Sequence, residues 1–97
     1  MTRSAKKLVL RLYVAGRGPN SLRALSNLRA ICGRHLGDGY ELEVIDVVSE
    51  PGRVVSGEVL VTPTLLRLKP EPVQTILGDL SDETLVVSAL GLDQVKK

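Results

Sequence analysis

Apolar and polar residues alternate near the amino end of the chain, from Leu8 to Val14. Alternation with period two is typical of a strand, because successive side chains point to opposite faces of a sheet. One face of such a strand is aliphatic and consists of Leu8, Leu10, Leu12 and Val14. The pattern therefore predicts a first strand over residues 8–14.

After Pro19 the apolar residues recur at intervals of three and four, which is the spacing of one helical face. Pro19 fits the first turn of a helix, because the N–H group that it lacks is not needed there. Gly37 and Gly39 allow the chain to reverse after the helix, since glycine reaches positive φ without a Cβ penalty. The predicted apolar face consists of Leu22, Leu25, Leu28, Ile31, Cys32 and Leu36.

A second strand is predicted over Glu41–Val48, which is dense in β-branched residues. A strand–helix–strand unit of this kind makes the two strands parallel and joins them by a right-handed crossover. Pro51 and Gly52 end the strand. Residues 53–61 predict a short, weak helix, because Gly57 and four valines lower the helix propensity.

Two short apolar runs follow, at residues 64–68 and 73–77, and Lys69-Pro70-Glu71-Pro72 separates them. The prolines suit a rigid connection and exclude a continuing helix, so the two runs are predicted to pair antiparallel. The Thr62-Pro63 bond lies directly before the first run and is a candidate cis peptide.

The last segment is compatible with two structures. Ser81 can cap a helix, and Asp82 and Glu83 suit its positive end. Gly91 would stop this helix, and its apolar face would consist of Leu85, Val86, Ala89 and Leu90. Residues 85–92 also alternate well enough to form a strand. With a helix here, the order of elements is βαβαββα, the thioredoxin-like α/β arrangement of a sheet covered by helices.

Length and composition narrow the classes of function. A chain of 97 residues buries one core, so a single domain is expected over residues 1–97. Apolar residues make up 43% of the chain and aromatic residues only 2%, which predicts a core of aliphatic side chains. The net charge of +2 comes from mixed charges with no basic stripe, so nucleic-acid binding is not expected.

Residues 1–7 form a basic segment, and the apolar run that follows it is interrupted by Arg11. This run is too short for a membrane span or for the core of a signal peptide. A single cysteine cannot form an internal disulfide, which suits a reducing compartment. A cytoplasmic protein that makes no membrane contact is therefore expected.

No catalytic residue, metal site or cofactor is expected. Thioredoxin chemistry needs a pair of cysteines at a helix start, whereas Cys32 is alone and lies on the apolar helical face. His35 is the only histidine, and with Cys32 it would give two ligands, fewer than a structural zinc needs. Asp79 and Asp82 could form a carboxylate pair, but their place at a turn and a helix start explains them without catalysis.

Five blocks in register resemble the KaiB family of circadian clock proteins, and the resemblance runs from about Leu8 to Leu92. The blocks are Leu12–Gly16, Pro19–Ser21, Val44–Val47, Thr62–Leu65 and Gly78–Asp82. The resemblance implies a non-enzymatic binding protein that docks on the N-terminal ATPase ring of KaiC. It also implies that the protein antagonises KaiA there and competes with the N-terminal domain of the kinase SasA.

The resemblance further implies two folds, a tetrameric ground state (βαββααβ) and a thioredoxin-like monomer that binds KaiC. The C-terminal stretch is a strand in the first and a helix in the second. Family members commonly carry Gly and Asp where this chain has Ala89 and Gly91. Alanine in a helix is about 1 kcal/mol more favourable than glycine, so the thioredoxin-like state is predicted here. The segment linked to the switch also contains Pro63, Pro70 and Pro72.

Partner binding is assigned to Arg23, Glu41, Glu43 and Glu58. Family members often have a basic residue where this chain has Glu43, on the strand whose edge meets KaiA. The same holds for Glu58, near the KaiC contact. Charge reversal at an interface costs several kcal/mol, so a divergent paralogue with other partners is an alternative. Arg23, on the first helix, is either part of a solvated face or an interface anchor.

Two other functions are alternatives. A thioredoxin-class redox protein is disfavoured because the dithiol is missing. A stand-alone sensor domain like that of SasA, acting on a histidine kinase, stays an alternative, although it is disfavoured because no kinase segment follows Lys97.

Overall fold

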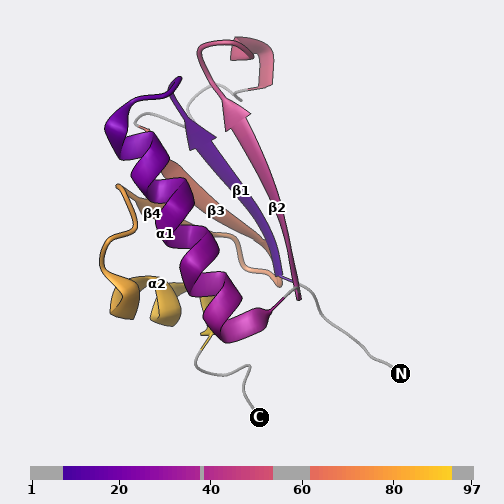
Figure 1. Cartoon of the computed structure of the whole chain (residues 1–97). Helices are drawn as coiled ribbons and strands as arrows, with labels where there is room; N and C mark the ends of the chain where they lie inside the picture. The colour runs from indigo at the N-terminus through magenta and orange to yellow at the C-terminus, as the bar shows by residue number, and fades with distance from the viewer. Residues whose placement is uncertain (1–7, 38, 54–61, 93–97) are drawn as a thin grey trace.

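The computed structural model describes residues 8–37, 39–53 and 62–92 (Figure 1). The described strands and helices are β1 (Leu8–Val14), α1 (Pro19–Leu36), β2 (Tyr40–Asp46), the short 3₁₀ turn η1 (Pro51–Arg53), β3 (Thr64–Lys69), β4 (Gln74–Leu77) and α2 (Glu83–Leu90). This order agrees with the predicted thioredoxin-like arrangement. The weak helix predicted over 53–61 lies outside the described residues, apart from Arg53 in η1.

The four strands form one sheet in the order β2-β1-β3-β4. β1 and β2 are parallel, with Leu8 opposite Tyr40 and Val14 opposite Asp46. β3 runs antiparallel to β1 and to β4, so residues 64–77 form the predicted hairpin. The Thr62-Pro63 bond is cis, as predicted, and the bonds before Pro70 and Pro72 are cis as well.

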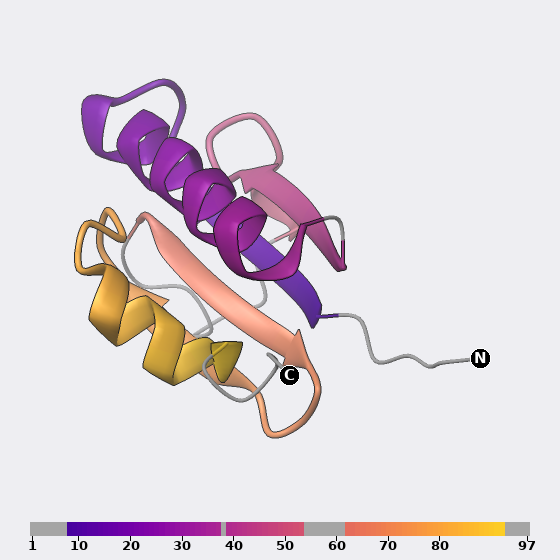
Figure 2. The same cartoon turned by 60° about the horizontal axis from the view of Figure 1, so that its bottom comes forward.

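Both helices lie on the same face of the sheet (Figures 1 and 2). The main core lies between them and the sheet, and it is aliphatic as predicted from the composition. From β1 it contains the predicted face of Leu8, Leu10, Leu12 and Val14. A smaller cluster of Tyr13, Ile45 and Leu66 packs separately from this core.

The predicted apolar face of α1 is wrong at its first member. Leu22 is 54% exposed, whereas Ser21 and Ala24 are buried in its place. The buried positions of α1 are Ser21, Ala24, Leu28, Ile31 and Cys32. The difference is confined to the first turn and a half of α1, because Leu28, Ile31 and Cys32 are buried as predicted and Leu25 and Leu36 pack partly buried against the core.

β2 ends at Asp46, two residues earlier than predicted. The Asp46 Oδ1 atom accepts hydrogen bonds from the backbone N–H groups of Gly16 and Val48, both at 2.9 Å. These bonds turn the chain and join the end of β2 to the loop that follows β1. They also lower the pKa of the Asp46 carboxyl group, chiefly through the Gly16 bond.

The C-terminal segment is a helix rather than a strand. Its cap is Asp82, whose Oδ1 accepts from the Leu85 N–H at 3.1 Å, so the predicted cap Ser81 is wrong. Ser81 instead donates its N–H to Asp79 Oδ1, which places Ser81 in the turn before the cap. Gly91 ends the helix at φ +75°, as predicted.

The apolar face of α2 differs from the prediction at one position. Val86 and Leu90 are buried, and Ala89 is partly buried against the core. Leu85 is 53% exposed, so its predicted place on the buried face is wrong. Val87 packs partly buried against the core in its place.

Arg67 on β3 is buried although it is charged. Its Nη1 donates to the Leu90 carbonyl at 3.2 Å, and its Nη2 donates to the Pro72 carbonyl at 2.9 Å. Arg67 therefore holds the end of α2 and the β3–β4 turn together. No described helix is both long and apolar enough to cross a bilayer.

Candidate functional site

The loop between β1 and α1, where a thioredoxin would carry its dithiol, contains no cysteine. Cys32 lies in the middle of α1 and is fully buried in the main core. Burial raises the pKa of the Cys32 thiol to about 11, which keeps it protonated and unreactive at neutral pH. Cys32 is a core residue, as predicted. Within the described ranges, no group of three His, Cys, Asp or Glu side chains could hold a metal ion.

The outer edge of β2 is the first candidate for partner binding. In the described part of the chain, β2 pairs only with β1 and forms one edge of the sheet. An edge strand can add a strand from a partner through main-chain hydrogen bonds. Glu41, Glu43 and Val44 are all exposed on β2.

Glu43 lies at the centre of a charge cluster made of Arg11, Glu43, Glu50 and Arg53. Arg11 Nε lies 3.2 Å from Glu43 Oε1, and Arg53 binds the other Glu43 oxygen. Arg53 also lies 3.3 Å from Glu50. The hydrogen bond from Arg53 lowers the pKa of the Glu43 carboxyl group, and Arg11 adds to this effect.

The charge cluster gives the β2 edge a definite electrostatic character. The charges of its two arginines and two glutamates sum to zero, and its side chains are exposed apart from Arg11, which is half-buried. Exposed pairs of this kind contribute little to stability, but they select partners by charge. A partner at this edge therefore meets ordered, alternating charges in place of a uniform basic or acidic surface.

The four predicted partner-binding residues do not form one site. Glu41 and Glu43 share one face of β2, since they are two positions apart. Ile45, on that same face, packs with Tyr13 in the smaller cluster rather than under α1. Arg23 lies on α1, which covers the other face. Glu58 lies outside the described residues.

Arg23 is exposed and links α1 to the turn before α2. Its Nη1 donates to Asn20 Oδ1 at 3.0 Å and to Asp79 Oδ2 at 3.3 Å. Asn27 strengthens the link by donating to the Asp79 carbonyl at 2.8 Å. Hydrogen bonds from Ser81 are the main cause of a lowered pKa of the Asp79 carboxyl group, and Arg23 adds to this effect. These contacts give Arg23 a positioning role that its sequence context did not indicate.

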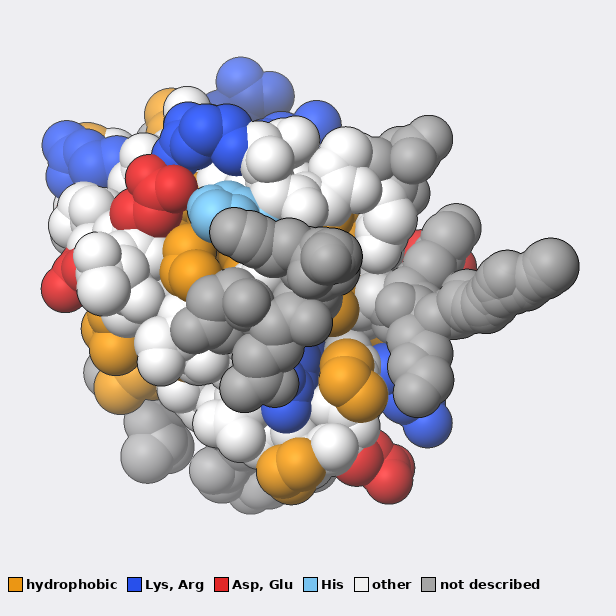
Figure 3. All heavy atoms as spheres, turned by 90° about the horizontal axis from the view of Figure 1, so that it is seen from below, with side chains coloured by type: hydrophobic (Ala, Val, Ile, Leu, Met, Phe, Trp, Pro, Cys, Tyr) orange, Lys and Arg blue, Asp and Glu red, His pale blue; other side chains and the backbone are white. Residues whose placement is uncertain are grey.

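A second polar contact, between α1 and the start of α2, was not predicted from the sequence. Glu83, in the first turn of α2, pairs with Arg34 in the last turn of α1. His35 Nε2 lies 3.4 Å from the same carboxylate, and Figure 3 shows the histidine at the surface beside charged side chains. Arg34 is the main cause of a lowered pKa of Glu83. No local pattern signals this contact, because the partners lie about fifty residues apart.

Comparison with known protein families gives one clear match. The model of the KaiB domain matches residues 11–92. The circadian clock protein KaiB3 of Synechocystis sp. is 44% identical over 89 residues, which cover 92% of this chain and 85% of that protein. The circadian clock oscillator protein KaiB of Prochlorococcus marinus is 47% identical over 88 residues, covering 91% of this chain and 82% of that protein.

Solved structures agree on the fold. The N-terminal domain of SasA from Synechococcus elongatus superposes with a TM-score of 0.74 and 27% identity, covering 100% of this chain and 93% of that domain. The germline-specific thioredoxin Deadhead of Drosophila melanogaster gives a TM-score of 0.68, covering 93% of this chain and 82% of that protein. Its identity of 15% shows the fold alone.

Proposed function

Because the chain belongs to the KaiB family, we propose that it is a non-enzymatic protein-binding module of a circadian clock or clock-like regulatory system. In this role it docks on a KaiC-type ATPase and competes there with SasA-type domains. KaiA-type proteins meet the same complex at the β2 edge. The protein acts through its surface, and it works as one domain in the cytoplasm.

One observation carries this proposal. The chain is 44–47% identical to named KaiB proteins over about nine-tenths of its length, and its fold matches the SasA N-terminal domain over its full length. Two clock proteins with one shape are suited to compete for one docking surface. The buried, protonated Cys32 supports a binding role over the thioredoxin-class redox alternative.

The helical state of residues 83–90 supports docking as a thioredoxin-like monomer. A tetrameric ground state, in which this segment is a strand, remains part of the proposal because the family resemblance implies it. Size-exclusion chromatography with light scattering distinguishes the two. A monomer is expected to dominate, and conversion to a tetramer would shift the molar mass fourfold.

Docking is tested by mixing the purified protein with a hexameric KaiC-type ATPase from a cyanobacterium and separating the mixture by size exclusion. Co-elution with the ring is expected, with Cys32→Ala binding as the wild type does. Absence of a complex at high micromolar concentration would reject KaiC-type partners and favour the divergent-paralogue alternative.

The resemblance to SasA supports a second function, a sensor domain that acts in trans on a histidine kinase. Autophosphorylation of a SasA-type kinase lacking its own N-terminal domain distinguishes the two functions. Stimulation by this chain, in the absence of any ATPase ring, would favour the sensor role over the clock-binding role.

A further inference from the structure

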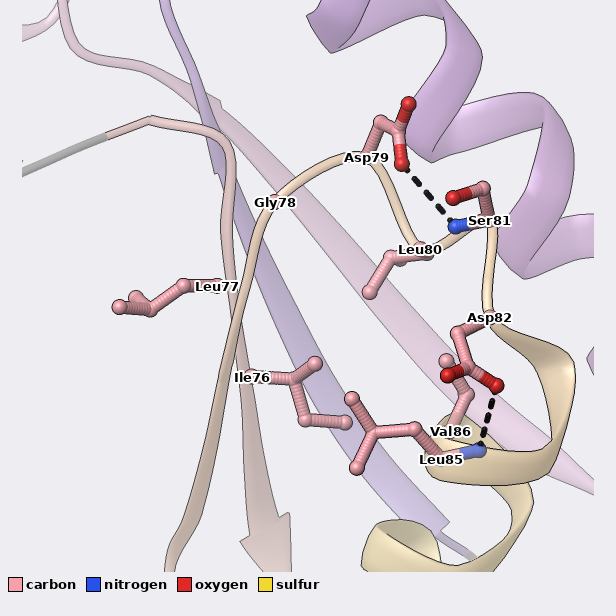
Figure 4. Close-up of a pocket in the computed structure, with 9 residues that line it drawn as sticks. All are labelled: Ile76, Leu77, Gly78, Asp79, Leu80, Ser81, Asp82, Leu85 and Val86. Carbon is pink, nitrogen blue, oxygen red and sulfur yellow. Dashed lines mark hydrogen bonds between the residues drawn. The ribbon is translucent and has the colours of Figure 1, made fainter.

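A pocket opens between the end of β4 and the first turn of α2 (Figure 4). Its volume is about 110 Å³. Its apolar wall consists of Ile76, Leu80, Leu85 and Val86, and Ser81 and Asp82 lie on its polar side. Figure 4 shows these apolar side chains gathered on one side of β4, whereas Leu77 points to the opposite side.

The size of the pocket restricts what can enter it. Pockets that bind small molecules and cofactors usually measure about 300–1,000 Å³. A cavity of about 150 Å³ holds a benzene molecule. The pocket of this chain is smaller than a typical ligand pocket and smaller than the cavity that holds benzene. Its volume therefore suits one branched aliphatic side chain.

The pocket adjoins a second edge of the sheet. β4 is the strand farthest from β2, and in the described part of the chain it pairs only with β3. The Gly78 N–H donates inward to the Pro63 carbonyl at 3.0 Å. Backbone groups of an antiparallel strand point alternately to its two sides, so those of Leu77 and Thr75 face outward. An added strand can pair with these groups.

Apolar side chains are exposed on both faces of this edge. Leu85 is 53% exposed on the pocket side, and Leu77 is 61% exposed on the other side. Side chains of an added strand would alternate between the same two faces. Two consecutive apolar residues would therefore cover both leucines, one entering the pocket and the next contacting Leu77.

The polar side of the pocket carries a negative charge. The carboxylate of Asp82 is exposed, and one of its oxygens caps α2. None of the basic side chains in the described ranges forms an ion pair with Asp82, whereas Asp79 and Glu83 pair with Arg23 and Arg34. Among the described carboxylates near the pocket, Asp82 is thus the one whose charge is available to a basic side chain of a partner.

We propose that the pocket and the outer edge of β4 bind an extended segment of a partner protein, with two consecutive branched apolar residues beside a lysine or arginine. One apolar side chain fills the pocket, its neighbour covers Leu77, and the basic residue meets Asp82. The segment is extended rather than helical, because the adjoining edge supplies main-chain hydrogen-bonding groups. This surface lies at the opposite edge of the sheet from β2 and is independent of docking there.

The probe is the blocked peptide acetyl-Lys-Val-Ile-Val-Lys-Gly-amide, titrated into the ¹⁵N-labelled full chain and followed by amide chemical shifts. Saturable shifts are expected between Thr75 and Val86. A peptide with glutamate in place of both lysines is expected to bind about two- to fivefold more weakly, the effect of one exposed ion pair.

Two variants separate the apolar contribution from the charge. Leu85→Gln removes the apolar side chain, and glutamine is favourable at the third helical position after the N-cap. This variant is expected to bind the peptide about tenfold more weakly. Asp82→Asn keeps the cap but removes the charge, so the basic and acidic peptides should then bind equally. Leu22→Gln is the matched control, since Leu22 and Leu85 are equally exposed.

Three outcomes would overturn the proposal. The first is the absence of saturable shifts at millimolar peptide. The second is binding that Leu22→Gln and Leu85→Gln weaken alike. The third is a set of shifts along β2 instead of β4. Docking on an ATPase ring can succeed or fail without changing any of these results.

Discussion

Arg67 shows how one buried side chain joins the end of the C-terminal helix to the β3–β4 turn. Its guanidinium group donates to the Leu90 carbonyl in a buried contact and to the Pro72 carbonyl in a partly buried one. A buried carbonyl that loses its donor costs the full desolvation of that group. Arg67 therefore stabilises the helical state of the C-terminal segment from a neighbouring strand.

Replacing Arg67 by Met is expected to lower the free energy of unfolding by about 1–3 kcal/mol, because the buried Leu90 carbonyl loses its donor. Urea denaturation followed by circular dichroism measures the loss. Arg67→Lys, which can reach one carbonyl, should lose less. Equal stability of wild type and Arg67→Met would contradict this role.

Cys32 gives a second test at the level of one residue. Because burial raises its thiol pKa to about 11, it should react with a thiol reagent only when the chain unfolds. Labelling is expected to be slow in buffer and complete in concentrated urea. Rapid labelling of the folded protein at pH 7 would show that the thiol is exposed or ionised.

Residue-level prediction from the sequence was correct for the burial of Cys32 and for the helix stop at Gly91, and it was incomplete for other positions. The inert Cys32 and the Gly91 stop follow from local rules about thiol pairs and positive φ. Leu22 and Leu85 were predicted to be buried but are exposed. The spacing of apolar residues indicates which side of a helix is apolar, but it does not fix which residues at the margin of that side face the sheet. Arg67 was missed because nothing local distinguishes a buried arginine from an exposed one.

At the level of elements, polar contacts join α1 to the turn before α2 and to the first residue of α2. Arg23 and Asn27 hold the turn at Asp79, and Arg34 and His35 hold Glu83. The strands and α1 were predictable because their apolar patterns are regular. The contacts between the helices were not, since they join residues far apart in the chain.

The Arg34–Glu83 pair predicts a pH dependence of stability. Arg34 lowers the pKa of Glu83 in the folded chain, so the pair stabilises the fold above the unfolded pKa of Glu83. This stabilisation is lost as the pH falls through the lowered folded pKa. Arg34→Gln should therefore be less stable than wild type at pH 7 but not in strong acid.

NMR titration checks the cause directly. In Arg34→Gln the pKa of Glu83 is expected to rise toward its ordinary value. Arg29→Gln, an exposed arginine on the same helix, should leave the pKa of Glu83 as it is in the wild type. A Glu83 pKa that does not respond to Arg34→Gln would mean that the pair does not persist in solution.

The balance between helix and strand in the C-terminal segment is tested by Ala89→Gly. Glycine in a helix costs about 1 kcal/mol relative to alanine, so the substitution should weaken α2. Amide and Cα chemical shifts of residues 85–90 are expected to move toward extended values. Unchanged helical shifts would show that Ala89 does not control the state of this segment.

At the level of the whole molecule, the sheet has two open edges in the described part of the chain, and they differ in chemistry. The β2 edge carries ordered, alternating charges, whereas the β4 edge carries exposed leucines and an acidic pocket. The fold, the family and the β2 edge were predictable from the sequence. The β4–α2 pocket was not, because it forms only when the hairpin and α2 pack together.

The central claim is that this thioredoxin-like chain occupies the surface of a KaiC-type ATPase that a SasA-type domain also uses. The most direct measurement is competition, in which a fluorescently labelled SasA N-terminal domain is first bound to the ATPase ring. Adding the unlabelled chain is predicted to lower the anisotropy to the value of the free domain. An anisotropy that stays constant under excess chain, with the ring intact, would contradict the account.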